Sequence, residues 1–171
     1  FLSNPAAKPT GFLNFKPKKL VLVDPWMVFE ELIYAKSWYG NSDKFGQKKQ
    51  NQYCEEVKAF FAKEILNREV EVHRTTSDEY FKNNQYKFDL IYIDGNHLYD
   101  FVKKDISNSL DHIDDHGIII LDDYKFQGWW NDGVTRAIDY FVKAKKIKIL
   151  NSHNFFNYHH QCILQKTSIL R

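Results

Sequence analysis

The sequence predicts an α/β fold in which buried strands alternate with amphipathic helices. Three continuous apolar runs have the length of strands covered on both faces: Leu20 to Val23, Phe88 to Ile93 and Gly117 to Leu121. A segment with helical apolar spacing follows each of the last two runs. This order is typical of βαβ units, whose right-handed crossovers build a mostly parallel sheet with helices on both faces.

The first half of the chain contains two strands and two helices. The run at Leu20 to Val23 ends at Asp24, because Pro25 cannot continue a strand. A helix is expected from near Gln47, and its apolar face is formed by Tyr53, Val57, Phe60, Phe61 and Ile65. Val70 to His73 is the next strand candidate, and the segment from Thr76 to Glu79 has the spacing of a helix cap.

The second half repeats the pattern and then changes it. Helix faces are formed by Tyr99, Val102, Ile106, Leu110 and Ile113, and by Val134, Ile138, Phe141 and Val142. Two closing strands, Ile147 to Leu150 and Gln161 to Leu164, are joined by the polar stretch Ser152 to His160, which suits antiparallel neighbours. We therefore predict a Rossmann-like, mostly parallel sheet with helices on both faces and an antiparallel C-terminal strand.

Composition limits the classes of protein that remain. A chain of 171 residues, 43% of them hydrophobic, suits one domain over residues 1–171. Its 24 basic and 22 acidic side chains nearly cancel, which argues against nucleic acid as a partner. No apolar run is long enough to span a bilayer, and two cysteines without a metal or disulfide spacing fit a cytoplasmic setting. The chain opens on Phe1, so we expect an N-terminally incomplete domain; whether it forms a homo-oligomer stays open.

Acidic residues follow three of the predicted strands. Asp24, Asp94 and the pair Asp122 and Asp123 are each the first polar residues after an apolar run. Carboxyl ends of parallel strands share one edge of the sheet, and ligands bind along that edge. Asp24 stands where nucleotide-binding folds place an acid that accepts hydrogen bonds from ribose hydroxyls, although it could equally begin a turn before Pro25.

The other three carboxylates indicate a cation. Carboxylates about 4 Å apart repel by roughly 4 kcal/mol per pair at an effective dielectric constant near 20. Oxygen ligands without cysteine suit magnesium, or else calcium or manganese, so Asp94, Asp122 and Asp123 are candidate metal ligands. In the alternative interpretation, one of the pair caps a turn and the others face solvent.

His97 follows Asp94 by three residues, and Gly95 between them permits a tight turn. An imidazole with an ordinary pKa near 6.5 can act as a general base, and a nearby cation would keep it neutral. The alternative is a histidine that bonds the backbone at a helix start. Tyr124, Trp129 and Trp130, in and beside the next loop, are candidates to wall a substrate pocket or to anchor that loop.

Four segments resemble a known family. Residues 89–106 (DLIYIDGNHLYDFVKKDI), 117–124 (GIIILDDY) and 133–141 (GVTRAIDYF) resemble class I S-adenosylmethionine-dependent methyltransferases of the macrocin-type sugar O-methyltransferase group, methyltransferase domain type 24. Residues 20–26 (LVLVDPW) look like that family's second strand, whose acid binds the cofactor ribose. The resemblance implies S-adenosylmethionine as cofactor, with Asp24, Trp26, Ser77, Asp78 and Asp94 in contact with it.

The position of His97 is also similar to that of the catalytic lysine of catechol-type O-methyltransferases. This similarity implies magnesium held by Asp94, Asp122 and Asp123, with Asp94 and His97 as catalytic residues. The expected function is a metal-assisted O-methyltransferase for a small hydroxylated molecule. One departure is that residues 1–19 lack the family's first strand and glycine-rich loop. The alternative function is therefore a non-catalytic Rossmann-like binding or assembly domain.

Overall fold

The computed structural model describes residues 17–37, 39–40, 46–155 and 159–167. Its elements are, in chain order, β1 (Leu20–Asp24), η1 (Leu32–Tyr34), α1 (Gln47–Phe60), α2 (Ala62–Leu66), β2 (Val70–Arg74), α3 (Ser77–Asn83), β3 (Phe88–Ile93), α4 (Tyr99–His112), β4 (Ile113–Leu121), α5 (Gly133–Lys143), β5 (Ile147–Phe155) and β6 (His159–Lys166). Within these ranges, none of the helices has the length and apolar content needed to cross a membrane.

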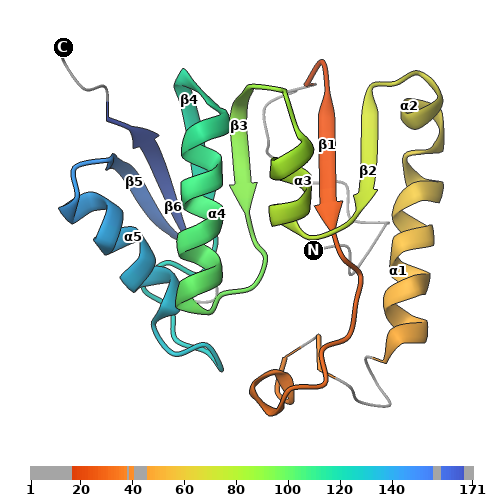
Figure 1. The fold of residues 1–171 in the computed structure, drawn as a ribbon, viewed down its shortest axis with the longest axis horizontal. Helices are drawn as coiled ribbons and strands as arrows, with labels where there is room; N and C mark the ends of the chain where they lie inside the picture. Colours follow the sequence, from red (N-terminus) through yellow and green to blue (C-terminus); the bar gives the residue numbers. More distant parts are fainter. Residues whose placement is uncertain (1–16, 38, 41–45, 156–158, 168–171) are drawn as a thin grey trace.

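The strands confirm the predicted α/β class. β1 pairs with β2 in parallel, and β3 pairs with β4 in parallel. β6 runs antiparallel to both β4 and β5, as expected for the C-terminal strands. β1 and β3 point the same way and lie next to each other in Figure 1, yet the described strands form two sheets, β1-β2 and β3-β4-β6-β5. A single continuous sheet was expected from the sequence, and no described strand joins these two edges.

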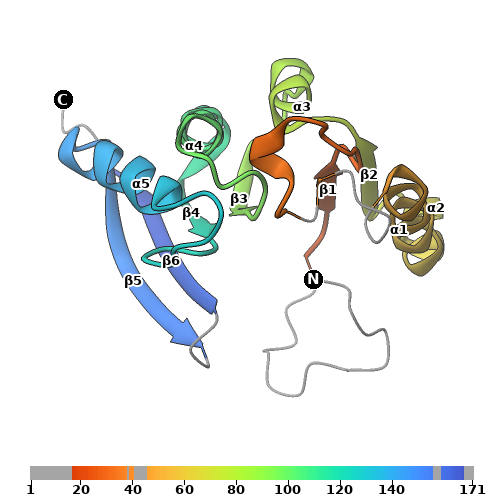
Figure 2. The same ribbon diagram turned by 90° about the horizontal axis from the view of Figure 1, so that it is seen from below.

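Helices lie on both sides of the strands, as Figure 2 shows. α3, α4 and α5 lie on one side, and α1 with α2 lies beside β2 on the other. Side chains of α4 and α5 form the larger core with the four-stranded sheet, and Ile106, Ile138 and Leu164 there are fully buried. A smaller core joins α1 to the two-stranded sheet through Trp26, Cys54 and Val57. Each large apolar side chain buried in this way contributes about 1.5–3 kcal/mol.

Local signals explain where several helices begin. Thr76 caps α3, because its side-chain oxygen accepts a hydrogen bond from the Glu79 amide, as the cap spacing predicts. α5 begins at Gly133, where a side chain could not fit: a Cβ atom would stand 2.3 Å from the carbonyl oxygen of His97. This close approach holds the start of α5 against the turn before α4.

Some predicted boundaries and faces were wrong. The helix expected to run past Phe60 breaks at Phe61, and Phe60 is 59% exposed although its spacing placed it on the apolar face. The described parts of the polar stretch from Ser152 to His160, residues 152–155 and 159–160, belong to β5 and β6, because pairing between these strands satisfies their backbone groups. β3 is not buried on both faces, since Leu90 and Tyr92 are 43% and 45% exposed.

Candidate functional site

The first two predicted acids meet at the carboxyl edge of the strands. Asp24 is the last residue of β1, and Asp94 follows β3. The Asp24 carboxylate is half-buried and accepts a hydrogen bond from the Trp26 amide. Burial raises the pKa of Asp24, and the charge of Asp94 raises it further, so the two carboxylates lie within electrostatic reach of each other. This pair favours ligands that donate hydrogen bonds.

His97 lies between two other strand-end acids. Its Nδ1 is 3.0 Å from Asp123 Oδ2, and its Nε2 is 3.4 Å from Asp94 Oδ1. The second distance is too long for a well-formed hydrogen bond, and Nε2 is buried without a hydrogen-bond partner among the described residues. Asp123 adopts a left-handed backbone conformation, with φ of 57°, which non-glycine residues at functional sites adopt at some cost. One nitrogen of the imidazole is thus hydrogen-bonded to Asp123, and the other lies beside Asp94 without a well-formed hydrogen bond.

The environment of His97 changes its expected protonation. Burial alone would lower its pKa, but the hydrogen bond to Asp123, the contact with Asp94 and the two negative charges raise the pKa to about 9. The sequence had suggested a neutral imidazole kept ready by a nearby cation. With only the protein's own groups around it, the imidazole at neutral pH is itself the cation between the carboxylates, and a neutral imidazole beside a bound cation stays a prediction.

The three carboxylates predicted to bind a metal ion do not fit that role as the structure arranges them. Asp94 and Asp123 both face His97, whereas Asp122 is 4% exposed and lies by Tyr92. Burial and then the Asp122 charge raise the pKa of Tyr92, which places these two side chains close together. Among the described residues, no group of three or more His, Cys, Asp or Glu side chains could hold a metal ion. The magnesium ion stays a prediction.

The three aromatic residues predicted to line a substrate pocket, Tyr124, Trp129 and Trp130, lie in two different environments. Trp130 packs edge-on against His97, with ring centroids 4.7 Å apart, and Trp129 packs edge-on against Trp130 at 5.7 Å. Both tryptophans are half-buried next to the strand-end acids. Tyr124, by contrast, is 6% exposed and belongs to the larger core. The tryptophans are therefore better placed than Tyr124 to contact a substrate, a role that stays a prediction.

The remaining predicted cofactor residues are already engaged in contacts within the protein. Trp26 is 7% exposed and packs in the smaller core, which favours the interpretation that it covers the sheet. Ser77 donates a hydrogen bond to Asp105, and Asp78 accepts hydrogen bonds from Lys104 and Asn108. These bonds tie the start of α3 to α4, and whether either residue also contacts a ligand is untested.

Sequence reasoning missed a buried tyrosine and its partner at this edge. Tyr34, in η1, is 4% exposed, and its hydroxyl accepts a hydrogen bond from Asn96 Nδ2 at 2.9 Å. Tyr39, from the same segment, has its pKa raised by burial and then by the charges of Asp24 and Asp94, which places it close to both. No period or motif marked these tyrosines. Asn96 could have been found, because an asparagine three residues before a helix start commonly bonds the chain ahead of it.

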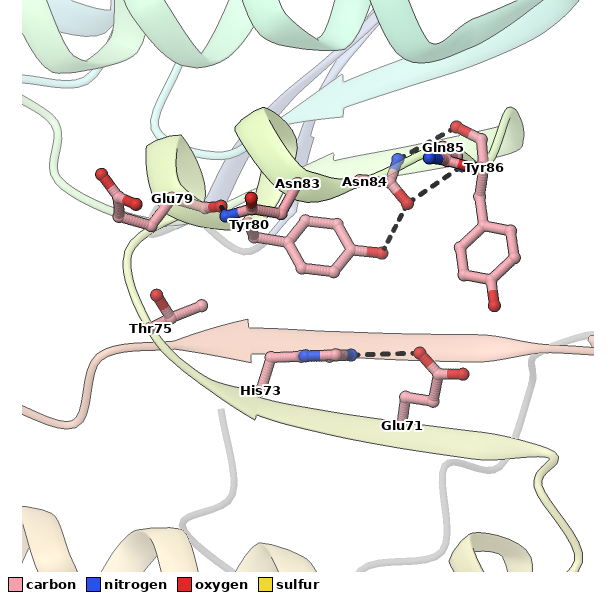
Figure 3. A pocket seen from close by; sticks show the side chains of 9 residues that line it. All are labelled: Glu71, His73, Thr75, Glu79, Tyr80, Asn83, Asn84, Gln85 and Tyr86. Carbon is pink, nitrogen blue, oxygen red and sulfur yellow. Dashed lines mark hydrogen bonds and ion pairs between the residues drawn. The ribbon is translucent and has the colours of Figure 1, made fainter.

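A cavity of about 610 Å³ lies elsewhere, between β2 and α3 (Figure 3). Polar side chains line it, and several bond one another: His73 to Glu71 at 3.0 Å, and the Tyr80 hydroxyl to Asn84 at 3.3 Å. Asp24, Asp94, His97 and Asp123 are not among the residues that line it. This cavity is therefore separate from the candidate site.

Comparison with protein families matches residues 6–124 to a family described as a methyltransferase domain. The chain belongs to this methyltransferase-domain family. A search of curated protein sequences found no match.

Solved structures share the fold of this methyltransferase domain at low sequence identity. The O-methyltransferase TomG from Streptomyces achromogenes, in complex with S-adenosylmethionine, is 9% identical, with 90% of this chain and 74% of that one covered and a TM-score of 0.56. An O-methyltransferase from Bacillus cereus, in complex with S-adenosylhomocysteine, is 13% identical, with coverage of 88% and 76% and a TM-score of 0.56. A candidate rRNA methylase from Clostridium thermocellum is 13% identical, with coverage of 90% and 89% and a TM-score of 0.57. The resemblance inferred from the sequence is confirmed for family and fold.

Proposed function

We propose that this methyltransferase domain transfers a methyl group from S-adenosylmethionine to a hydroxyl group of a small molecule of sugar or natural-product type. The observation that supports the proposal is that groups suited to bind a cofactor and to accept a proton lie together at the carboxyl ends of the strands. Asp24 and Asp94 present carboxylates suited to hydroxyl donors, and Nε2 of His97 has no hydrogen-bond partner among the described residues, with Asp94 beside it. O-methyltransferases with bound cofactor or product share the fold, which supports this reaction class.

Asp24 is the residue we assign to the cofactor ribose. Its carboxylate stands at the end of a parallel strand, where α/β folds bind ribose hydroxyls. The raised pKa of Asp24 reflects burial and the nearby Asp94, and hydroxyl groups that donate to these oxygens would stabilise both charges. Trp26 contributes by its backbone: its carbonyl oxygen accepts hydrogen bonds from Gln47 and Arg74, which fix the chain just after Asp24.

His97 is the residue we assign to proton transfer. S-adenosylmethionine supplies the methyl group when it is bound. As the substrate oxygen is methylated, Nε2 of neutral His97 would accept the hydroxyl proton. Asp123 holds Nδ1 and stabilises the imidazolium that forms, and Asp94 lies beside Nε2. Trp130 packs edge-on against the imidazole, and Trp129 packs against Trp130.

Metal assistance is a separate hypothesis that comes from the sequence alone. The imidazole of His97 lies between two of the three proposed ligands, and this arrangement does not fit a metal ion bound by all three. No step of the proposed reaction therefore depends on magnesium. Measured activity that vanishes with a chelator and returns with Mg²⁺ would support the metal hypothesis.

The proposal is tested by incubating the protein with S-adenosylmethionine and panels of sugars, phenols and RNA, and by measuring S-adenosylhomocysteine release. We expect release with a hydroxylated small molecule, and at least a hundredfold less with the His97→Gln variant, given the usual contribution of a general base. Release with RNA alone would assign the domain to nucleic acid. Absence of cofactor binding would favour the non-catalytic alternative.

A further inference from the structure

Tyr34 closes a ring of contacts around the proton-transfer residue. Its hydroxyl bonds Asn96, the neighbour of His97 in sequence, at 2.9 Å. Its ring packs edge-on against Trp129 at 5.6 Å, Trp129 packs against Trp130 at 5.7 Å, and Trp130 packs against His97 at 4.7 Å. Tyr34 is therefore connected to His97 in two ways: through Asn96, its neighbour in the backbone, and through the packed rings of Trp129 and Trp130.

The hydrogen bond to Tyr34 acts on a side chain that is fixed at both ends. Asn96 Oδ1 accepts a hydrogen bond from the Leu98 amide at 3.0 Å, while Asn96 Nδ2 donates to Tyr34. Leu98 is the N-cap position of α4, and its own side chain makes no capping bond. The Tyr34 hydroxyl thus sets the orientation of the amide that spans the turn from Asn96 to Leu98, which contains His97.

The segment that carries Tyr34 is built to hold this ring in place. Its two ends pair, because the Phe29 amide donates to the Tyr39 carbonyl oxygen at 2.7 Å. The ring of Phe29 lies 4.9 Å from that of Tyr34. Gly40 fits only without a side chain, since a Cβ atom would stand 2.3 Å from the Tyr34 carbonyl oxygen. Within η1, Leu32 and Ile33 are 92% and 51% exposed while Tyr34 is buried, so the short helix turns this one side chain inward.

We infer that Tyr34 is a positioning residue for the proposed methyl transfer, which holds His97 in place through Asn96 on one side and Trp129 on the other. The inference depends on the proposed function for its catalytic consequence, but the positioning itself can be observed in the protein without substrate. Tyr34 belongs to the loop after β1, the strand that ends at Asp24. It therefore links the segment proposed to bind cofactor to the turn proposed to transfer a proton.

The test compares Tyr34→Phe with the matched control Tyr80→Phe. Tyr80 is also buried, its hydroxyl also bonds an asparagine, and its ring also packs against a histidine, His73, at 5.0 Å. In Tyr34→Phe we expect the NMR signals of the His97 ring protons to move at fixed pH. Exchange of the Leu98 amide should become about tenfold faster, the equivalent of one hydrogen bond between neutral groups. Neither change should occur in Tyr80→Phe.

Activity provides the second readout. Tyr34→Phe should lower kcat about tenfold and leave the KM for S-adenosylmethionine unchanged, because the hydrogen bond acts on orientation at the reacting centre. If Tyr34→Phe fails to fold, Trp129→Leu can be used instead. It removes the ring that packs between Tyr34 and Trp130 and should also move the His97 signals. Unchanged His97 signals in a folded variant overturn the inference. If the His97 signals move but the protein transfers no methyl group, the positioning role of Tyr34 stands and the proposed function is rejected.

Discussion

Replacing His97 with glutamine should flatten the dependence of stability on pH between about 6.5 and 9. In the folded protein the pKa of His97 is raised from 6.5 to about 9, chiefly by Asp123 and Asp94 acting against the effect of burial. A folded-state pKa above the unfolded value means that the folded protein holds the proton more tightly. The resulting stability is fully present below pH 6.5 and is lost as the pH rises through 9.

The size of this effect follows from the shift. At about 1.4 kcal/mol for each pKa unit, the rise corresponds to roughly 3 kcal/mol of unfolding free energy that disappears over this range. The side chain of His97 is only 10% exposed, so solvent screens little of it.

Urea unfolding at pH 6, 7.5 and 9 measures the effect as a difference between the two proteins, which cancels the other titrating groups. The free energy of wild-type unfolding should fall by about 3 kcal/mol more than that of His97→Gln from pH 6 to 9. Parallel curves for the two proteins would show that His97 is not held between two ionised carboxylates, and the account of the site would then be wrong.

Three further predictions concern the site and the fold. Because His97 accepts a proton only when neutral, kcat/KM for methyl transfer should rise with pH up to about 9, and a rate that is flat from pH 7 to 9 contradicts its role as the base. Ile106→Ala should lower the free energy of unfolding by about 2–5 kcal/mol, whereas Phe60→Ala, at a 59% exposed side chain, should cost far less; equal losses in urea unfolding would refute the assignment of the core. Thr76→Ala should lower the free energy of unfolding by about 1 kcal/mol, because it removes the hydrogen bond to the Glu79 amide, whereas Thr76→Ser should keep most of that stability. Equal losses for the two variants in thermal unfolding would exclude the cap.

Most of the fold could be predicted because its signals are local. The strand that ends at Asp94 and the helix face that includes Ile106 are marked by apolar spacing, and both occur where expected. Thr76 is a cap because the interaction lies within one turn of the chain. Extension of β5 to Phe155 and of β6 back to His159 could not be predicted, because pairing between the two strands determines it.

The site was predictable only in outline. Strand topology brings Asp24 and Asp94 to one edge, and a motif drew attention to His97. The protonation of His97 depends on which carboxylates face it, and this geometry has no signature in sequence. Tyr34 was missed for the same reason, since only the folded chain brings it to Asn96.

The most direct test of the central claim is calorimetric titration of the protein with S-adenosylhomocysteine, comparing wild type with Asp24→Asn. The account predicts measurable binding to wild type and affinity reduced about tenfold or more in Asp24→Asn, since a charge-assisted hydrogen bond to ribose is lost. Glu79→Gln, at an acid on α3 not assigned to the cofactor, should bind like wild type. Equal affinity of Asp24→Asn and wild type would contradict the assignment of Asp24, and no binding to either protein would contradict the function proposed for the whole site.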